Sequence, residues 1–288
     1  MRHKSKLCVV WGIELMKIKR EEIDQLSFDV RRIIDGQAVD LRDNLEGRLS
    51  ILKNDIHTLA GRLSEQADSL QKEKIALADN LADISHQLRT PLTAMSVMVE
   101  LLEKVPAEKQ AEFIMNLKQG LAQTGWLVNS LLKMAKLDSG GVTFTPIDIT
   151  ANELLNLALQ PLQVLLDIKN QQVNLTGTAD FFCDNNWTAE VLTNIIKNAS
   201  EHSPENSTIE ITAGTNPLSC WLAITDNGDG IPQAELKGLF KRFVSSKKGT
   251  GIGLPLSLAI MQGQNGDIEV DGGGNGRGAK FTLKFYAQ

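Results

Sequence analysis

A histidine inside a predicted helix is the first candidate for chemistry in this sequence. His86 lies in the segment Ser-His-Gln-Leu-Arg-Thr-Pro-Leu, two residues after Ile84 and two before Leu88. At 3.6 residues per turn this spacing turns His86 about 200° away from both apolar neighbours, so we expect its ring to face solvent. Pro91 lacks a backbone amide and predicts a kink just beyond His86. An exposed imidazole can act as a nucleophile, although a solvated histidine without a role is the alternative.

A second candidate site is a polar face on a helix predicted over residues 189–203. Asn194, Asn198 and His202 recur every four residues and therefore share one side of that helix. The opposite side carries Val191, Leu192, Ile195, Ile196 and Ala199. Three aligned polar side chains favour ligand binding, and a simply solvated face is the alternative.

Three glycine-rich turns follow this helix. Residues 226–230 read Asp-Asn-Gly-Asp-Gly directly after the apolar run 221–224, which predicts a strand that ends at Asp226. That carboxylate can accept a hydrogen bond from an exocyclic amine. Residues 249–254, Gly-Thr-Gly-Ile-Gly-Leu, open a predicted helix, and glycines let backbone amides approach phosphates at a helix N-terminus. Residues 276–281 precede a closing strand. Each cluster alone is typical of an ordinary turn, but their order favours a nucleotide site.

Long helices must position His86. A heptad repeat of apolar residues predicts helices packed side by side. Its members are Leu49, Ile56, Leu63, Leu70, Leu77 and Ile84, with Leu81 and Leu88 in the alternate positions. The helix should end near Lys104, and a returning helix with Pro106 in its first turn should end near Leu137. Two such hairpins predict a dimeric four-helix bundle.

In this order the motifs of residues 72–288 resemble those of the sensor histidine kinases of two-component systems. The resemblance matches His86 to the phosphoacceptor. It matches residues 194–202, 226–230, 240–243 and 249–254 to the asparagine, first glycine, phenylalanine and second glycine boxes. It implies a multidomain fold, in which an all-α helical hairpin forming a dimeric four-helix bundle is followed by an α+β sandwich that binds ATP.

The resemblance also implies a division of the chain into domains. Residues 1–71 would be an N-terminal helical signal-transmission segment, similar to a degenerate HAMP linker or coiled coil, with helix interrupted near residues 35–36 and 44–47. Residues 72–137 would dimerise and carry the phosphoryl group, 138–141 would be a linker, and 142–288 would be the catalytic ATP-binding domain. A break in the heptad register over residues 63–81 predicts a weak stretch through which an input reaches His86.

For the site, the resemblance implies ATP and Mg²⁺, with Asp226 on the adenine amine and Asn198 on the metal. Arg242, Lys247 or Lys248 would lie close to the phosphates, and an ordinary solvated loop is the alternative for the two lysines. A hard cation such as Mg²⁺ prefers oxygen ligands. The residues expected to bind the nucleotide are Asn194, Asn198, His202, Asp226, Gly228, Gly230, Arg242, Lys247, Lys248, Gly249, Gly251, Gly253 and Leu254.

The sequence departs from the family pattern at two places. Gln87 stands where the family usually has a carboxylate, and because glutamine cannot accept a proton, we expect slower autophosphorylation. Thr90 matches the position that orients water for dephosphorylation, so phosphatase activity should be retained. Glu201 stands where a lysine is frequent, and its negative charge would repel phosphate; the cost is small if Glu201 points away from the asparagine face, and Lys247, Lys248 or Arg242 could compensate.

The leading prediction is a histidine kinase that autophosphorylates His86 with ATP and passes the phosphoryl group to an aspartate of a response-regulator receiver domain. Two alternatives stay open. One is a phosphatase-dominant member with weak autokinase activity, indicated by Gln87 and Thr90. The other is a non-kinase ATPase of the same nucleotide fold, of the gyrase or Hsp90 type, or a scaffold.

Composition limits the remaining functions. The chain has 288 residues, is 42% hydrophobic and carries a net charge of −5, which argues against a nucleic-acid partner. Cys8, Cys183 and Cys220 lack metal-ligand spacing. The apolar run 7–13 is shorter than the roughly 20 residues that span a bilayer. We therefore expect a cytoplasmic protein, the cytoplasmic portion of a sensor whose membrane region is missing or separate, or a peripherally membrane-associated protein.

Overall fold

The computed structural model describes residues 20–42, 48–102, 104, 106–244, 250–273 and 277–286. The chain divides into two compact units, Met1–Asp79 and Asn80–Gln288. Lys247, Lys248 and Gly249 lie outside the described residues, as do the apolar run 7–13, Cys8 and the break predicted at residues 44–47. In the described part, no helix is both long and apolar enough to cross a bilayer.

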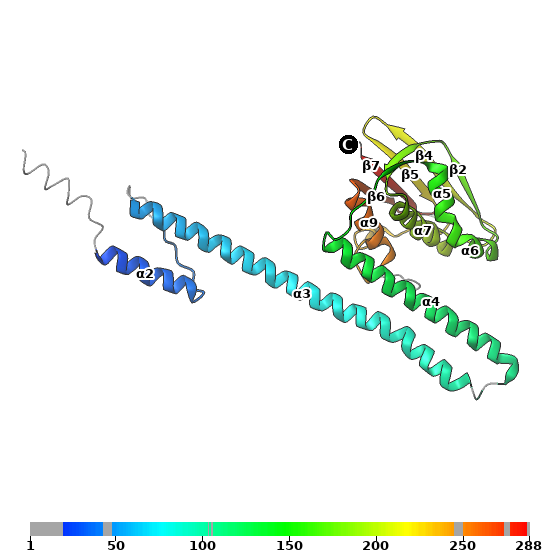
Figure 1. The fold of residues 1–288 in the computed structure, drawn as a ribbon, viewed down its shortest axis with the longest axis horizontal. Helices are drawn as coiled ribbons and strands as arrows, with labels where there is room; N and C mark the ends of the chain where they lie inside the picture. The colour runs from blue at the N-terminus through cyan, green and yellow to red at the C-terminus, as the bar shows by residue number, and fades with distance from the viewer. Residues whose placement is uncertain are drawn as a thin grey trace, which may run out of the picture. The chain divides into compact units, whose positions relative to one another are not determined.

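The first unit holds α2 (Arg20–Ile34) and the beginning of α3 (Arg48–Leu102), labelled in Figure 1. The prediction of helix over residues 37–42 is wrong, because this segment has no regular secondary structure. Gly36 adopts φ +80, which ends α2, and the Asp40 carboxylate accepts hydrogen bonds from the backbone amide and guanidinium of Arg42. Such local side-chain bonds compete with helix formation. Leu41 is buried, so the segment 37–42 is a packed connector between the two helices.

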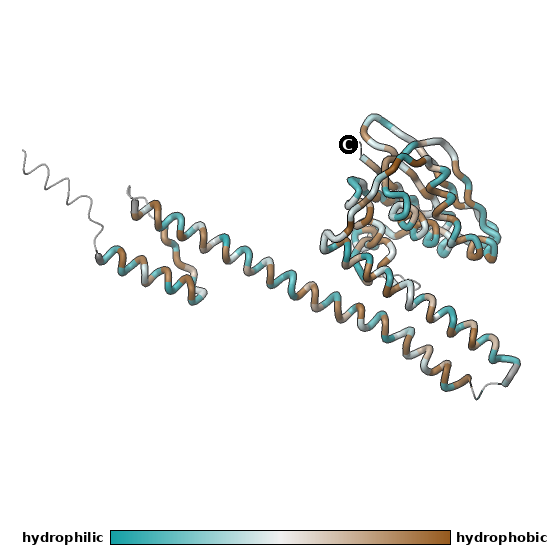
Figure 2. The backbone as a smooth tube through the Cα atoms, in the orientation of Figure 1, coloured by the Kyte–Doolittle hydropathy of each residue, from teal (hydrophilic) through white to brown (hydrophobic). Residues whose placement is uncertain are grey.

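The second unit begins with a helical hairpin, made by the end of α3 and by α4 (Ala107–Asp138). α3 remains helical across Pro91, although Pro91 has no amide to donate to the Gln87 carbonyl. Pro106 lies at the N-cap of α4, where a missing amide costs little. Brown apolar positions alternate with teal polar ones along both helices in Figure 2. Many of these apolar side chains are exposed, among them Leu92, Val99, Ile114, Leu121 and Leu132.

After the hairpin comes an α+β sandwich. Its five-stranded sheet has the order β2-β4-β5-β7-β6, in which the β2–β4 pair is parallel and the other pairs are antiparallel. The strands are β2 (Gln172–Thr176), β4 (Thr208–Asn216), β5 (Ser219–Thr225), β6 (Gly266–Asp271) and β7 (Lys280–Tyr286). A separate antiparallel pair joins β1 (Ile147–Thr150) to β3 (Asp180–Cys183). A helical hairpin followed by an α+β sandwich was the predicted fold, and the structure confirms it.

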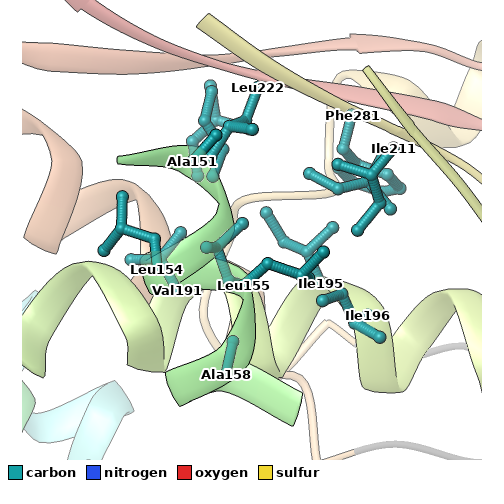
Figure 3. Packing of buried hydrophobic residues seen from close by; sticks show 14 of the residues in the cluster. Ala151, Leu154, Leu155, Ala158, Val191, Ile195, Ile196, Ile211, Leu222 and Phe281 are labelled. Carbon is teal, nitrogen blue, oxygen red and sulfur yellow. The ribbon is translucent and has the colours of Figure 1, made fainter. Parts of the chain in front are cut away.

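One layer of helices supplies the other half of the core. These helices are α5 (Ala151–Leu159), the 3-10 turn η1 (Gln160–Leu162), α6 (Gln163–Ile168), α7 (Asn185–His202) and α9 (Gly253–Gly263), and the short α8 (Gln233–Leu236) has no buried residue. Figure 3 shows Leu154 of α5 and Ile195 of α7 pointing toward Leu222 and Phe281 of the sheet. Alternate residues of β4 are buried, as expected for a sheet with one covered face. This core fixes α7 and the ends of β5 and α9, which carry the predicted site.

Candidate nucleotide and phosphoacceptor site

The phosphoacceptor candidate lies on the second unit's part of α3. The His86 side chain is exposed, as the spacing of its apolar neighbours predicted, and Gln87 is half-buried. Thr90 is exposed one turn further on, and its hydroxyl donates to the His86 backbone carbonyl at 3.2 Å. The helix therefore presents the imidazole and the threonine to solvent, one turn apart.

The predicted polar helix is α7, which begins four residues earlier than its sequence pattern indicated. Asp184 is its N-cap, and its Oδ1 accepts from the amides of Asn186 and Trp187 at 3.1 and 3.2 Å. Satisfying these otherwise unpaired amides is why the helix starts here. The Asn194 amide is buried and donates to the Ser257 hydroxyl of α9 at 3.5 Å.

The other two members of this face are more accessible. Asn198 is half-buried, and among the described residues its amide has no hydrogen-bond partner, while His202 is exposed. Glu201 forms an ion pair with Lys197 at 3.8 Å, so its charge is balanced one turn back along the helix. Within the described residues, this face therefore presents the Asn198 amide oxygen to a ligand.

Asp226 is held at the end of β5 by backbone groups on two sides. Its Oδ1 accepts from the amides of Gly228 at 2.8 Å and Ala279 at 3.0 Å, and the side chain is 6% exposed. Burial raises the pKa of Asp226 above its usual value, although the two amide hydrogen bonds and the nearby His202 partly offset this. Oδ2 has no hydrogen-bond donor among the described residues and is left to accept from a ligand. Gly230, with φ +78, ends this turn.

The contribution of the last glycine cluster was not predicted. A Cβ added to Gly278 would lie 1.8 Å from the Asp226 carbonyl oxygen and 2.4 Å from its Oδ1. Only glycine therefore allows this segment to approach Asp226 closely enough for the Ala279 amide to bind it. The run of glycines over residues 272–278 was a visible signal, but nothing in the sequence connected it to a residue about 50 positions earlier.

The second glycine motif leads into α9. Gly251 adopts φ +67, and a Cβ there would lie 2.8 Å from the backbone of Phe243. A side chain is therefore excluded at Gly251 by both conformation and space. Gly253 begins α9 and lies near the Asn194 amide, whereas Leu254 packs against the core. The helix N-terminus and the asparagine face thus meet at Gly253.

The basic residue expected near the phosphates has another partner in this structure. Both terminal nitrogens of Arg242 donate to the two oxygens of Asp138 at the end of α4, at 2.9 and 2.7 Å. The two residues are 104 positions apart, and sequence spacing gave no sign of the pair.

The chain that follows α4 is fastened to the sandwich at Phe144 and Thr145, shortly after the linker predicted at residues 138–141. Asp184 Oδ2 accepts from the amide and hydroxyl of Thr145 at 3.0 and 3.1 Å. Phe144 makes an edge-to-face contact with Trp187 and covers Gly263 of α9. Asp184 therefore caps α7 and anchors the incoming chain with one carboxylate.

The residues around Asn198 and Asp226 are better suited to bind a nucleotide than to bind a metal ion without one. Within the described ranges no three His, Cys, Asp or Glu side chains gather to hold a metal. A cation here would need oxygen from the Asn198 amide and from the phosphates of its own ligand. The Oδ2 atom of Asp226, which accepts no hydrogen bond within the described residues, suits a ligand with an exocyclic amine.

Two family profiles match the chain. The family described as His Kinase A (phospho-acceptor) domain matches residues 76–140, which include His86. The family described as Histidine kinase-, DNA gyrase B-, and HSP90-like ATPase matches residues 183–288, which include α7, Asp226 and α9. Together they cover more than half of the chain, and they assign residues 76–140 to a phosphoacceptor domain and residues 183–288 to an ATPase domain.

Curated relatives resemble nearly the whole chain. Sensor histidine kinase WalK of Bacillus subtilis is 27% identical over 92% of this chain and 45% of WalK. Sporulation kinase C of the same organism is 28% identical over 96% of this chain and 61% of the relative. The histidine-protein kinase/phosphatase MprB of Mycobacterium sp. (strain KMS) is 27% identical over 70% of this chain and 42% of MprB. The chain thus spans about half the length of these relatives.

Solved structures share the fold. Histidine kinase AdeS of Acinetobacter baumannii superposes with a TM-score of 0.59 at 23% identity, over 70% of this chain and 97% of that one. Histidine kinase ThkA, solved in complex with the response regulator protein TrrA, gives a TM-score of 0.63 at 18% identity, over 78% of this chain and 66% of that one. With a phosphoacceptor profile over His86, an ATPase profile over the asparagine helix and relatives that are sensor kinases, this chain belongs to the sensor histidine kinases of two-component systems.

Proposed function

We propose that the protein autophosphorylates His86 with ATP and passes the phosphoryl group to an aspartate of a response-regulator receiver domain. The observation that carries the proposal is the Asp226 carboxylate, in which two backbone amides hold Oδ1 and leave Oδ2 to accept. An adenine amine is the donor that this acceptor suits. The exposed His86 on the same chain then supplies a nucleophile.

The proposed nucleotide site extends from Asp226 to the start of α9. The phosphates would lie near Gly251 and Gly253, where backbone amides at a helix N-terminus favour negative charge. The Asn198 amide oxygen would hold Mg²⁺ together with the phosphates and water, and the metal would neutralise the charge of the transferring group. Arg242 can reach phosphate only after it leaves Asp138.

The transfer itself requires little covalent help from the protein. A ring nitrogen of His86 forms a bond to the γ-phosphorus while the bond between that phosphorus and the ADP oxygen breaks, and the ring proton passes to solvent. Gln87 can accept a hydrogen bond from the imidazole and orient the ring, but it cannot take the proton. Positioning is therefore the main contribution of α3.

We also propose a homodimer through the helical hairpin. Exposed apolar side chains on α3 and α4 would be covered by the same residues of a second copy. A groove between the two helices, lined by Thr93, Val97, Met98, Leu101 and Phe113, belongs to this face. An assembly of four helices removes this apolar surface from water.

Labelling with γ-³²P-ATP and Mg²⁺ tests the proposal. The wild-type chain should acquire acid-labile label, and His86→Ala should abolish it. His57→Ala removes another histidine from the same helix and is the matched control, which should retain the label. Label that persists in His86→Ala, or that is lost equally in His57→Ala, would contradict the assignment of His86.

A phosphatase activity is the second candidate function. Thr90 is exposed one turn after His86, and its hydroxyl is the side-chain group best placed on this face to orient a water molecule. Gln87, which is a poor proton acceptor, would shift the balance away from autophosphorylation. Dephosphorylation of a phosphorylated receiver domain should slow in Thr90→Ala but not in Ser96→Ala, which removes an exposed hydroxyl from the same helix. Equal rates in both variants would contradict the role of Thr90.

A further inference from the structure

A buried glutamine, Gln171, lies where the chain between α6 and β2 meets the end of α7. Its side chain is 7% exposed, so its amide needs hydrogen-bond partners within the protein. Nε2 lies 3.2, 3.3 and 2.9 Å from the backbone carbonyl oxygens of Ser200, Ser203 and Pro204, to which it donates. Oε1 accepts from the Ser200 hydroxyl at 2.6 Å. Both ends of the Gln171 amide are therefore bound to the C-terminal end of α7.

The carbonyl groups at this helix end need partners from outside the helix. α7 ends at His202, and the carbonyls in the last turn of an α-helix lack the amides of a following turn. The Lys169 ammonium also donates to the Ser200 carbonyl, and a positive charge is favourable at a helix C-terminus. The Lys169 carbonyl accepts from the Asn206 amide at 3.0 Å, which fixes the loop beside the helix. Residues 169–171 thus close the end of α7.

The same helix end packs against the turn that carries Asp226. The buried Ser203 hydroxyl accepts from the Asn227 backbone amide at 3.1 Å. A Cβ added to Gly228 would lie 2.7 Å from the His202 carbonyl oxygen, so the turn is in close contact with the helix. The Gly228 amide is one of the two that hold Oδ1 of Asp226. The position of the helix end therefore sets the position of this carboxylate.

We propose that Gln171 is a positioning residue for the adenine end of the nucleotide site, and that it acts on Asp226 through Ser203. This inference rests on the proposed function, because it takes Asp226 as the group that accepts from the adenine amine. Without the Gln171 amide, the carbonyls of Ser203 and Pro204 lose a buried donor, and an unpaired buried acceptor is costly. The helix end then shifts toward water, and the turn at Asp226 shifts with it.

The effect should be confined to the adenine end of the site. At the phosphate end, α7 is joined to α9 by the hydrogen bond from Asn194 to the Ser257 hydroxyl, about two helical turns before His202. An interaction that is equally strong in the bound substrate and in the transition state affects KM and not kcat. Loss of the Gln171 amide should therefore raise the KM for ATP and leave kcat unchanged.

Initial rates of His86 labelling over a range of ATP concentrations test this separation in the full chain. Gln171→Met retains most of the side-chain volume but has no amide, and it should raise the KM for ATP by about tenfold, with kcat within about twofold of wild type. A variant that was only less stable would contain less active protein, which lowers kcat at an unchanged KM. Gln172→Met is the matched control, because Gln172 is the next residue and is exposed. It should have the KM and kcat of wild type.

A double-mutant cycle tests the path through Asp226 without phosphoryl transfer. In a titration with ADP and Mg²⁺, Gln171→Met should bind ADP about tenfold more weakly than wild type. In the Asp226→Asn background, which has already lost the adenine contact, the same substitution should change ADP affinity by less than about twofold. Ser203→Ala removes the acceptor of the Asn227 amide and should reproduce the effect of Gln171→Met in both backgrounds.

The outcomes separate the two proposals. Wild-type KM and ADP affinity in Gln171→Met, or in Ser203→Ala if the first variant does not fold, would overturn the positioning role and leave the kinase function intact. A lower kcat at an unchanged KM, or equal losses of ADP affinity in both backgrounds, would overturn it as well. A wild-type chain that binds neither ATP nor ADP would overturn the proposed function and this inference with it.

Discussion

The close approach of Gly278 to Asp226 allows a sharp prediction. In Gly278→Ala the new methyl group would lie 1.8 Å from the Asp226 carbonyl oxygen, whereas carbon and oxygen normally stay about 3.3 Å apart. The segment must therefore move by about 1.5 Å, and overpacking of this kind costs about 1–3 kcal/mol. Moving the segment also weakens the hydrogen bond from Ala279 to a charged acceptor, which adds about 1.5–3 kcal/mol.

The total, about 2.5–6 kcal/mol, should lower the unfolding temperature of the sandwich by about 5–24 °C. The same movement displaces the Asp226 carboxylate, so ADP affinity should fall by about tenfold or more. Differential scanning calorimetry and an ADP titration measure the two effects. Gly238→Ala is the control, because its Cβ would meet nothing closer than 3.7 Å. A Gly278→Ala protein with the unfolding temperature and ADP affinity of wild type would refute the steric argument.

Three further predictions concern charge and proton transfer. Burial alone would raise the pKa of Asp184, but hydrogen bonds from Thr145 and the start of α7 outweigh it and lower the pKa. Asp184→Asn should therefore lose about 1–3 kcal/mol at neutral pH. Acid-unfolding curves of the two proteins should converge as the pH falls below about 4, because the stabilisation is complete above the unfolded pKa and is lost through the lower folded pKa. For Asp226, whose pKa is raised, stability changes with pH in the opposite direction. The folded protein loses stability as the pH rises from the unfolded pKa through the higher folded pKa, because the ionised carboxylate is buried. Asp226→Asn should thus unfold at a higher temperature at pH 8, with the gain vanishing near pH 3, while ADP affinity falls by about tenfold because an amide donor would face the adenine amine. Gln87→Glu should raise the initial rate of acid-labile labelling by about tenfold or more, and an unchanged rate would count against a missing proton acceptor.

Sequence periodicity was enough to predict the elements that carry the site. The four-residue spacing of Asn194, Asn198 and His202, backed by an apolar side, predicted α7, and an apolar run ending at Asp226 predicted β5 and its turn. The heptads predicted the long helix that exposes His86. These are local patterns, and each is set by the burial of one face.

The contacts between distant segments could not be predicted in the same way. Arg242 and Asp138 are both polar residues at exposed positions, and nothing local in the sequence distinguishes their pair from solvated charges. The contact between Trp126 and Lys197 brings together α4 and α7, and the sequence does not specify the path of the chain between these helices. The break at Gly36 was predicted, but its continuation through the connector 37–42 was missed, because no sequence pattern signalled the local hydrogen bonds between Asp40 and Arg42. Tertiary packing decided the first two, and local hydrogen bonds decided the third.

The anchoring of Thr145 by Asp184 limits how far the ATP-binding sandwich can travel. With Asp138 at the end of α4 and Phe144 packed on Gly263, residues 139–143 are the chain left between the two anchored points. Fully extended, five residues reach about 17 Å. A tether of this length keeps the sandwich at an effective concentration in the millimolar range around the helices. Phosphoryl delivery within an assembled dimer should therefore be first order, and its rate should not change when the protein is diluted.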